Sequence, residues 1–145
     1  MRRALFAGTF TPFTIGHADI VKRGLELFDE VVIAIGENQD KPSADLDERV
    51  DAIRAVYKDD SRVRVEVYHS LTVDFAREVG ACALLRGVRS MIDFEYERQM
   101  ADANRALAGI ETVVLFTRSE LSHVSSSLVR DLKKHGADVS AFVAR

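Results

Sequence analysis

The chain has 145 residues, of which 47% are hydrophobic, and its formal net charge is −3. This length suffices for one hydrophobic core without disulfides or metals, so we predict a single domain over residues 1–145. A slightly acidic chain lacks the positive field that would attract nucleic acids or anionic membranes, which argues against both as partners. Its one cysteine, Cys82, lies in an apolar run, and we expect a small buried residue in a cytoplasmic protein.

The first half of the chain reads as strand, helix, strand, helix and strand. Apolar residues at helical spacing predict a helix from about His17 to Phe28. A second helix opens at Asp45, which stands three residues before Glu48 at the spacing of a capping box, and it turns Val50, Ile53 and Val56 inward. Three short β-rich apolar runs predict the strands, over Ala4–Ala7, Val31–Gly36 and Val63–Tyr68.

The second half continues the alternation. A helical pattern over Val73–Val79 is stopped by Gly80, the residue that helix C-termini prefer. Two more strands, over Ala83–Arg86 and Thr112–Phe116, enclose the longest and most charged helix, over Asp93–Leu107. A last helix begins among the serines 125–127, whose hydroxyls suit capping, and ends before Gly136.

This alternation of strands and helices is typical of a parallel sheet with crossover helices. Because crossovers are right-handed, we predict an α/β fold: a Rossmann-like, doubly wound, five-stranded parallel sheet with helices on both faces. In such folds the ligand lies beyond the carboxyl ends of the strands, where the winding reverses.

A loop bracketed by Gly8 and Gly16 follows the first predicted strand and delivers His17 to the first turn of a helix. Free N–H groups and the dipole favour phosphate at a helix start, and His17 adds a donor that can be neutral or cationic near neutral pH. Taken alone, this loop is better explained as an ordinary turn with His17 as a capping or surface residue.

Two arginines, Arg86 and Arg89, flank Gly87 at the end of the fourth predicted strand. A planar guanidinium matches the oxygens of a phosphate, which favours phosphate binding for the pair. For Arg89 alone, a surface ion pair with Asp93 or Glu95 is an equal alternative.

Two further strands end in anion-binding elements. A serine-rich loop, His123–Arg130, opens the last helix, although by itself it is explained by a plain N-cap. Lys41 follows the second strand across a polar turn, and a lone surface lysine usually has no function. Because four strand ends meet at one edge of the sheet and each brings such an element, together they predict a site for a nucleotide polyphosphate.

Three segments resemble the motifs of phosphopantetheine adenylyltransferases, a family of the HxGH nucleotidyltransferase superfamily. Gly8–His17 resembles GTFDPxTxGH, Arg86–Glu97 resembles RGxRxxxDFEYE, and Val124–Arg130 resembles ISSSxVR. The first and last segments mark the wider superfamily, whereas Arg86–Glu97 is specific to the family.

The resemblance implies the transfer of the adenylyl group of ATP to 4′-phosphopantetheine, which gives dephospho-CoA and pyrophosphate in coenzyme A biosynthesis. It implies catalytic roles for His17 and Lys41. It implies that the acceptor is bound by Thr9, Lys41, Thr72 and Arg86. The residues implied for ATP are Thr9, Phe10, His17, Gly87, Val88, Arg89, Glu97, Leu121, Ser122, His123, Val124, Ser125, Ser126 and Ser127.

A phosphomonoester is mostly deprotonated at neutral pH, so in-line attack on the α-phosphorus needs no general base and no covalent intermediate. We expect His17 and Lys41 to stabilise the transition state, while Arg89 and the helix near Ser126 hold the leaving phosphates. Mg²⁺ is expected on ATP, with no metal site in the protein, because no carboxylate cluster is visible. The resemblance also implies a homohexamer.

Three positions depart from what is usual in the family: Thr11 replaces the usual Asp, Ala7 replaces the usual Pro, and Leu121 replaces a frequent Trp. Two alternatives remain. One is an enzyme that transfers CMP or AMP to another phosphate, such as glycerol 3-phosphate or nicotinamide mononucleotide, and Arg86–Glu97 argues against it. The other is a non-catalytic regulatory module that binds a nucleotide, which Thr11 motivates and the pair His17 and Lys41 opposes.

Overall fold

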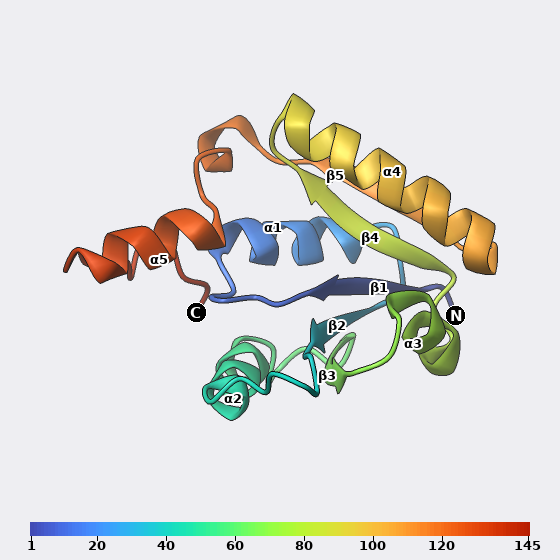
Figure 1. Cartoon of the computed structure of the whole chain (residues 1–145), viewed down its shortest axis with the longest axis horizontal. Coiled ribbons are helices and arrows are strands. Elements are labelled where there is room, and N and C mark those ends of the chain that lie inside the picture. The colour runs from blue at the N-terminus through green and yellow to red at the C-terminus, as the bar shows by residue number, and fades with distance from the viewer.

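The computed structural model describes residues 1–145 as a five-stranded parallel sheet with the strand order β3-β2-β1-β4-β5 (Figure 1). The strands are β1 (Arg3–Gly8), β2 (Glu30–Gly36), β3 (Val63–Tyr68), β4 (Ala83–Val88) and β5 (Glu111–Phe116). The helices are α1 (Ile15–Gly24), α2 (Leu46–Val56), α3 (Thr72–Val79), α4 (Met91–Ala108) and α5 (Ser126–Lys134), with a 3-10 turn, η1, over Ser119–Leu121.

The winding reverses at β1, since the chain adds β2 and β3 on one side of it and then β4 and β5 on the other. β1 pairs with β2 along its whole length, but its pairing with β4 is limited to Ala4 with Ala83 and Leu5 with Leu84. The two strands therefore diverge toward their carboxyl ends. This opens the crevice in which doubly wound folds hold their ligands.

Hydrophobic side chains cover both faces of the sheet. On one face, residues such as Phe6, Ile33 and Leu85 form a cluster of 16 buried residues with α1 and α2. On the other face, a smaller cluster joins residues such as Leu5 and Leu84 to α3. Burial on both faces explains why the strands read as continuous apolar runs rather than as alternating ones. None of the helices combines the length and the apolar character needed to cross a membrane.

The predicted fold class is confirmed, and the ends of several elements differ from the prediction. α1 starts at Ile15 and ends at Gly24, so the apolar Phe28 packs into the core from the turn after the helix. β4 continues to Val88, because Gly87 and Val88 still pair with β5. α4 begins at Met91, where the Ser90 hydroxyl accepts the N–H of Asp93. Gly80 adopts the left-handed conformation at the end of α3, as predicted (φ 74°).

Two expectations about individual residues are wrong. Asp45 precedes α2 but forms no side-chain cap, because its carboxylate accepts from Ser43 and Arg49 instead. Cys82 is exposed rather than buried. It directly precedes β4 at the amino edge of the sheet, where its N–H donates to the carbonyl of Arg3 but its side chain is left outside the core.

Candidate active site

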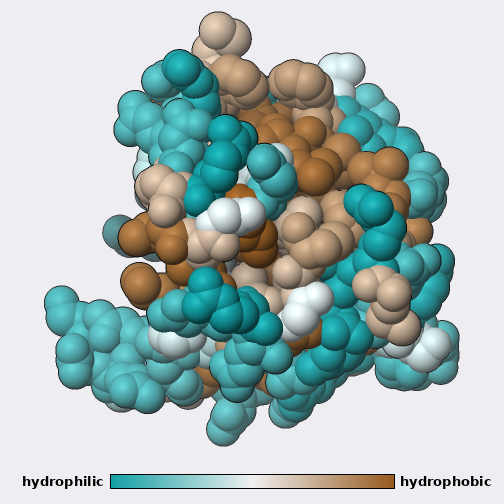
Figure 2. Space-filling model, turned by 90° about the vertical axis from the view of Figure 1, so that its right-hand side faces the viewer, coloured by the Kyte–Doolittle hydropathy of each residue, from teal (hydrophilic) through white to brown (hydrophobic).

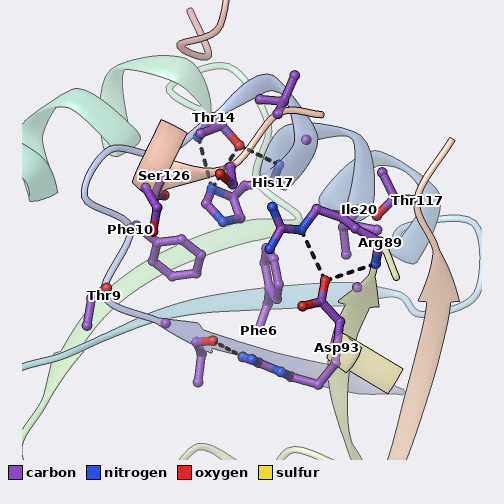
Figure 3. A pocket seen from close by; sticks show the side chains of 18 of the residues that line it. Phe6, Thr9, Phe10, Thr14, His17, Ile20, Arg89, Asp93, Thr117 and Ser126 are labelled. Atoms are coloured by element: carbon purple, nitrogen blue, oxygen red, sulfur yellow. Dashed lines mark hydrogen bonds and ion pairs between the residues drawn. The ribbon is translucent and has the colours of Figure 1, made fainter. Parts of the chain in front are cut away.

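A cavity of about 360 Å³ lies at the carboxyl ends of β1 and β4, where these strands diverge (Figure 3). Its walls come from the β1–α1 loop, the end of β4 and the starts of α1, α4 and α5. The residues of these segments that line it include Thr9, Phe10, His17, Arg86, Gly87, Arg89, Glu97, Val124, Ser125, Ser126 and Ser127. Segments far apart in the sequence are thus brought together as the topology predicts.

Unused backbone donors border this cavity at two helix starts. In the first turn of α1, the N–H groups of Ile15 and His17 are already bonded, which leaves that of Gly16 without a partner. At the start of α5, the N–H groups of Ser126 and Ser127 also have no partner in the chain, and all three residues line the cavity. Such N–H groups, together with the helix dipoles, favour phosphate oxygens.

His17 forms a capping box with Thr14, the residue before α1. The hydroxyl of Thr14 accepts the N–H of His17 at 3.2 Å, and the N–H of Thr14 donates to Nδ1 of His17 at 2.9 Å. Because Nδ1 accepts a hydrogen bond, the proton of the neutral ring lies on Nε2. Thr14 therefore fixes His17 as an Nε2–H donor.

Aromatic rings surround the imidazole of His17. Phe13 stacks on it with the ring centres 5.4 Å apart, and Phe10 meets it edge-on at 5.0 Å. Burial, assisted by the positive charges of Arg86 and Arg89, lowers the pKa of His17 from 6.5 to about 4. Of the two states that the sequence allows near neutral pH, the structure thus favours the neutral one.

Phe10 is expected from the sequence to contact ATP, but its ring is directed into the core. Only 3% of the residue is exposed, and its backbone has the left-handed φ of 52°, which is uncommon for a bulky side chain. A Cβ added to Gly8 would lie 3.0 Å from the Phe10 ring, so Gly8 provides the space for it. The ring of Phe10 supports His17, and contact with ATP stays a prediction.

Arg86 forms a bidentate ion pair with Glu97 of α4. Its Nε and Nη2 donate to the two carboxylate oxygens at 2.9 and 2.7 Å, and Nη1 donates to the carbonyl of Ala7 across the gap between β4 and β1. Burial lowers the pKa of Arg86, but the bonds and charge of Glu97 outweigh it and raise the pKa overall. Glu97, which is 7% exposed, thus orients Arg86 with both of its oxygens.

For Arg89 the sequence leaves open phosphate binding or a surface ion pair, and its position is compatible with both. Its Nε lies 3.1 Å from the carboxylate of Asp93, so the ion pair exists. Both residues nevertheless line the cavity, as the close view shows (Figure 3).

A second cavity, of about 460 Å³, lies between α3 and α4 and is lined mainly by hydrophobic residues. It contains three of the four residues predicted for the acceptor: Thr9, Thr72 and Arg86. Its wall also carries Tyr68, whose hydroxyl lies 2.9 Å from that of Thr72 and whose ring stacks on Phe75. Thr9, Arg86 and Glu97 line both cavities, so the two spaces meet at the Arg86 guanidinium.

Several predicted residues lie outside both cavities. Lys41 is exposed in the β2–α2 loop, and its N–H donates to the carbonyl of Asn38. The side chain of Val88 is buried. The remaining residues, Leu121, Ser122 and His123, belong to η1 and the turn after it, and only the part of this segment from Val124 onward reaches the first cavity.

Sequence reasoning missed Thr14, Tyr68, Asp93 and Thr117, all of which line a cavity. A signal existed for Thr14, because Thr followed three residues later by a polar residue has the spacing of a capping box. Tyr68 ends β3 and Thr72 begins α3, so their placement at the carboxyl edge was also readable.

The departure at Thr11 is accommodated by Arg130 of α5. Nη1 of Arg130 donates to the carbonyl and the hydroxyl of Thr11, at 2.8 and 3.0 Å. The C-terminal segment steadies the same region, since Ile15 donates to the carbonyl of Phe142 and Ala144 to that of Phe13. No group of three or more His, Cys, Asp or Glu side chains is arranged to hold a metal ion.

Comparison with known proteins agrees with this geometry. The cytidylyltransferase-like family model matches residues 5–132. The phosphopantetheine adenylyltransferase of Bacteroides fragilis is 53% identical over the whole of this chain and 97% of its own. That of Porphyromonas gingivalis is 52% identical over 97% of this chain and 92% of its own. The chain belongs to the phosphopantetheine adenylyltransferase family. The family recognised in the sequence is therefore confirmed, and with it a nucleotidyltransferase.

Solved structures support the fold alone. A bifunctional NMN adenylyltransferase/ADP ribose pyrophosphatase from Francisella tularensis aligns with 99% of this chain at a TM-score of 0.72 and 13% identity, and the chain spans 44% of that protein. A lipopolysaccharide core biosynthesis protein from Thermoplasma volcanium aligns with 81% of this chain and 97% of its own, at a TM-score of 0.57 and 21% identity. These proteins thus share the fold of this chain at low sequence identity.

Proposed function

We propose that this protein transfers the adenylyl group of ATP to 4′-phosphopantetheine and releases pyrophosphate and dephospho-CoA. The observation that carries the proposal is the meeting of two cavities at the Arg86 guanidinium. A nucleotide in one cavity and a phosphorylated acceptor in the other would bring their phosphates together there.

The first cavity suits the polyphosphate of ATP. The free N–H groups of Gly16, Ser126 and Ser127, with the guanidinium of Arg89, provide donors from three separate segments. The carboxylates that line the cavity, Asp93 and Glu97, are both engaged by arginines. This fits a Mg²⁺ ion that is held by phosphate oxygens and water rather than by the chain, and that would neutralise phosphate charge.

The second cavity suits the acceptor. Phosphopantetheine has a charged phosphate at one end and a long, weakly polar arm. The cavity likewise has Arg86 at the end it shares with the first cavity, while hydrophobic residues and a few hydroxyls line the rest. Thr72 and Tyr68 offer hydroxyls to the arm. Glycerol 3-phosphate is a much smaller acceptor and would leave most of this space unused.

The chemistry requires charge stabilisation rather than proton transfer. The acceptor phosphate is already deprotonated, so a neutral His17 serves as an Nε2–H donor to the crowded α-phosphate in the transition state. Lys41 lies outside both cavities, in the loop that follows Gly36 of the acceptor cavity, and we propose that it approaches the phosphates as a second cation when the substrates bind. Arg89 and the start of α5 would hold the departing pyrophosphate.

The test is pyrophosphate release from ATP or CTP with three acceptors: phosphopantetheine, glycerol 3-phosphate and nicotinamide mononucleotide. We expect turnover only with ATP and phosphopantetheine. In His17→Ala, turnover should fall by about 10² to 10³, because one well-placed donor is lost, while ATP binding stays within a few-fold. Turnover with another acceptor alone would favour the rival transferases. ATP binding without any turnover would favour the regulatory module.

We also propose that the protein is a cytoplasmic homohexamer. Large apolar side chains of α4 are exposed, among them Met91 and Ile92 at 83% and Leu107 at 68%. A broad apolar area also lies in the upper half of Figure 2. Covering such surface by self-association is favourable. Light scattering after size-exclusion chromatography measures the mass, and a monomer at micromolar concentration would contradict the hexamer.

A further inference from the structure

Arg49 lies on α2, outside both large cavities, yet its side chain contacts the β1–α1 loop. Nη1 donates to the carbonyl of Thr9 at 2.6 Å, and the side chain is only 11% exposed. Its one carboxylate partner, Asp45, is 3.3 Å away and 57% exposed. An exposed ion pair contributes little to folding stability, so the contact with Asp45 does not explain why the guanidinium of Arg49 lies at this loop. The carbonyl of Thr9 is the closer contact.

The carbonyl of Thr9 is well placed to control the site. Thr9 lines both cavities, and the next residue, Phe10, holds its left-handed backbone while its ring packs on His17. A residue in a sparsely populated conformation persists only where its surroundings hold it. A shift of the Thr9 carbonyl would therefore move Phe10, and with it the support of the His17 ring.

The other side of Arg49 is connected to the loop that carries Lys41. Asp45 accepts from the hydroxyl of Ser43 and from Arg49, and chiefly the bond from Ser43 keeps the pKa of its carboxyl below the ordinary value. The N–H of Ser43 in turn donates to Glu37 at the start of the same loop. Arg49 thus joins the loop after β2 to the loop after β1.

We propose that Arg49 is a positioning residue that holds the Thr9 carbonyl in register with the Lys41 loop, and so sets the distance between the nucleotide and the acceptor. This role rests on the proposed function. Misplacement of reacting groups by about 1 Å can cost about 10²-fold in rate, so a residue that touches neither substrate can still limit turnover.

The same helix supplies a matched control. Arg54 of α2 donates from Nη2 to the carbonyl of Val65 in β3 at 3.0 Å, and it lines neither large cavity. Arg49→Met and Arg54→Met each remove one guanidinium–carbonyl bond from α2. Only the first variant releases the β1–α1 loop. Arg49→Lys keeps a cationic donor, and it serves as the rescue variant if Arg49→Met is poorly folded.

We expect Arg49→Met to lower kcat for pyrophosphate release by about 10- to 100-fold, with KM for ATP changed less than kcat. Arg54→Met should keep kcat within about 2-fold, and Arg49→Lys should recover most of the loss. Hydrogen exchange adds a readout that needs no activity. The amides of Thr14, Ile15 and His17 are bonded at the end of this loop, and they should exchange several-fold faster in Arg49→Met than in Arg54→Met.

The proposal is overturned if Arg49→Met keeps wild-type kcat and exchange, or if Arg54→Met changes both equally. Losses of kcat that merely follow the fall in Tm across the variants would also overturn it, because they would show a general loss of stability. If the wild-type protein releases no pyrophosphate with any acceptor, the proposed function fails. The exchange measurement then still decides whether Arg49 holds the loop.

Discussion

The buried His17 should make the protein lose stability in mildly acidic solution. In the unfolded chain a histidine takes up its proton near pH 6.5, whereas burial lowers the pKa of the folded His17 to about 4. Between these values the unfolded state binds more protons than the folded state. The stability that the neutral ring contributes is therefore present above pH 6.5 and is lost as the pH falls toward 4.

The lowered pKa of His17 corresponds to about 3 kcal/mol of stability when it is lost completely, of which about 2 kcal/mol disappears between pH 7 and pH 4.5. Urea denaturation of the wild type and of His17→Asn across this range measures it. The carboxylates titrate in both proteins, so the difference between their pH profiles isolates the histidine. Asn keeps an acceptor for the N–H of Thr14. Parallel profiles would refute the buried neutral ring.

Three other substitutions test the site. Arg86→Lys loses the planar fork, so phosphopantetheine should bind about 10-fold more weakly in calorimetry while ATP binding changes little; the reverse pattern would assign Arg86 to the nucleotide. Thr11→Asp places a carboxylate beside Arg130, so pyrophosphate release titrated with magnesium should stay within a few-fold of wild type, and a larger loss would contradict the accommodation of Thr11. Gly8→Ala puts a Cβ 3.0 Å from the Phe10 ring. It should lower the free energy of unfolding by about 1–3 kcal/mol in urea denaturation and also lower turnover. Unchanged stability would show that the ring can move.

The fold could be predicted from the sequence because each strand is a short apolar run and most helices show apolar residues at helical spacing. β2 shows this best, since its residues from Glu30 to Ile35 are all buried and alternation cannot obscure the pattern. Helix ends were less predictable. Phe28 belongs to the core whether or not the backbone is helical, so its hydrophobicity says nothing about where α1 stops.

The sequence predicts which strand ends meet at the site, but not the direction of each side chain there. Topology alone brings the first, fourth and fifth strand ends to one cavity. The direction of a side chain depends on local hydrogen bonds that the sequence does not reveal. Lys41 lies outside the cavities in a polar turn, where its N–H donates to the carbonyl of Asn38, and Glu97 faces Arg86 through a bidentate ion pair.

The pairing of Phe142 and Ala144 with the residues before His17 bears on how the molecule forms. β1 and α1 are made first during synthesis, but the last hydrogen bonds that fix the start of α1 come from the opposite end of the chain. Contacts of such long sequence separation carry a high cost of loop closure. We therefore expect the start of α1, where the phosphate donors lie, to become fully ordered only after the C-terminal segment has packed against it.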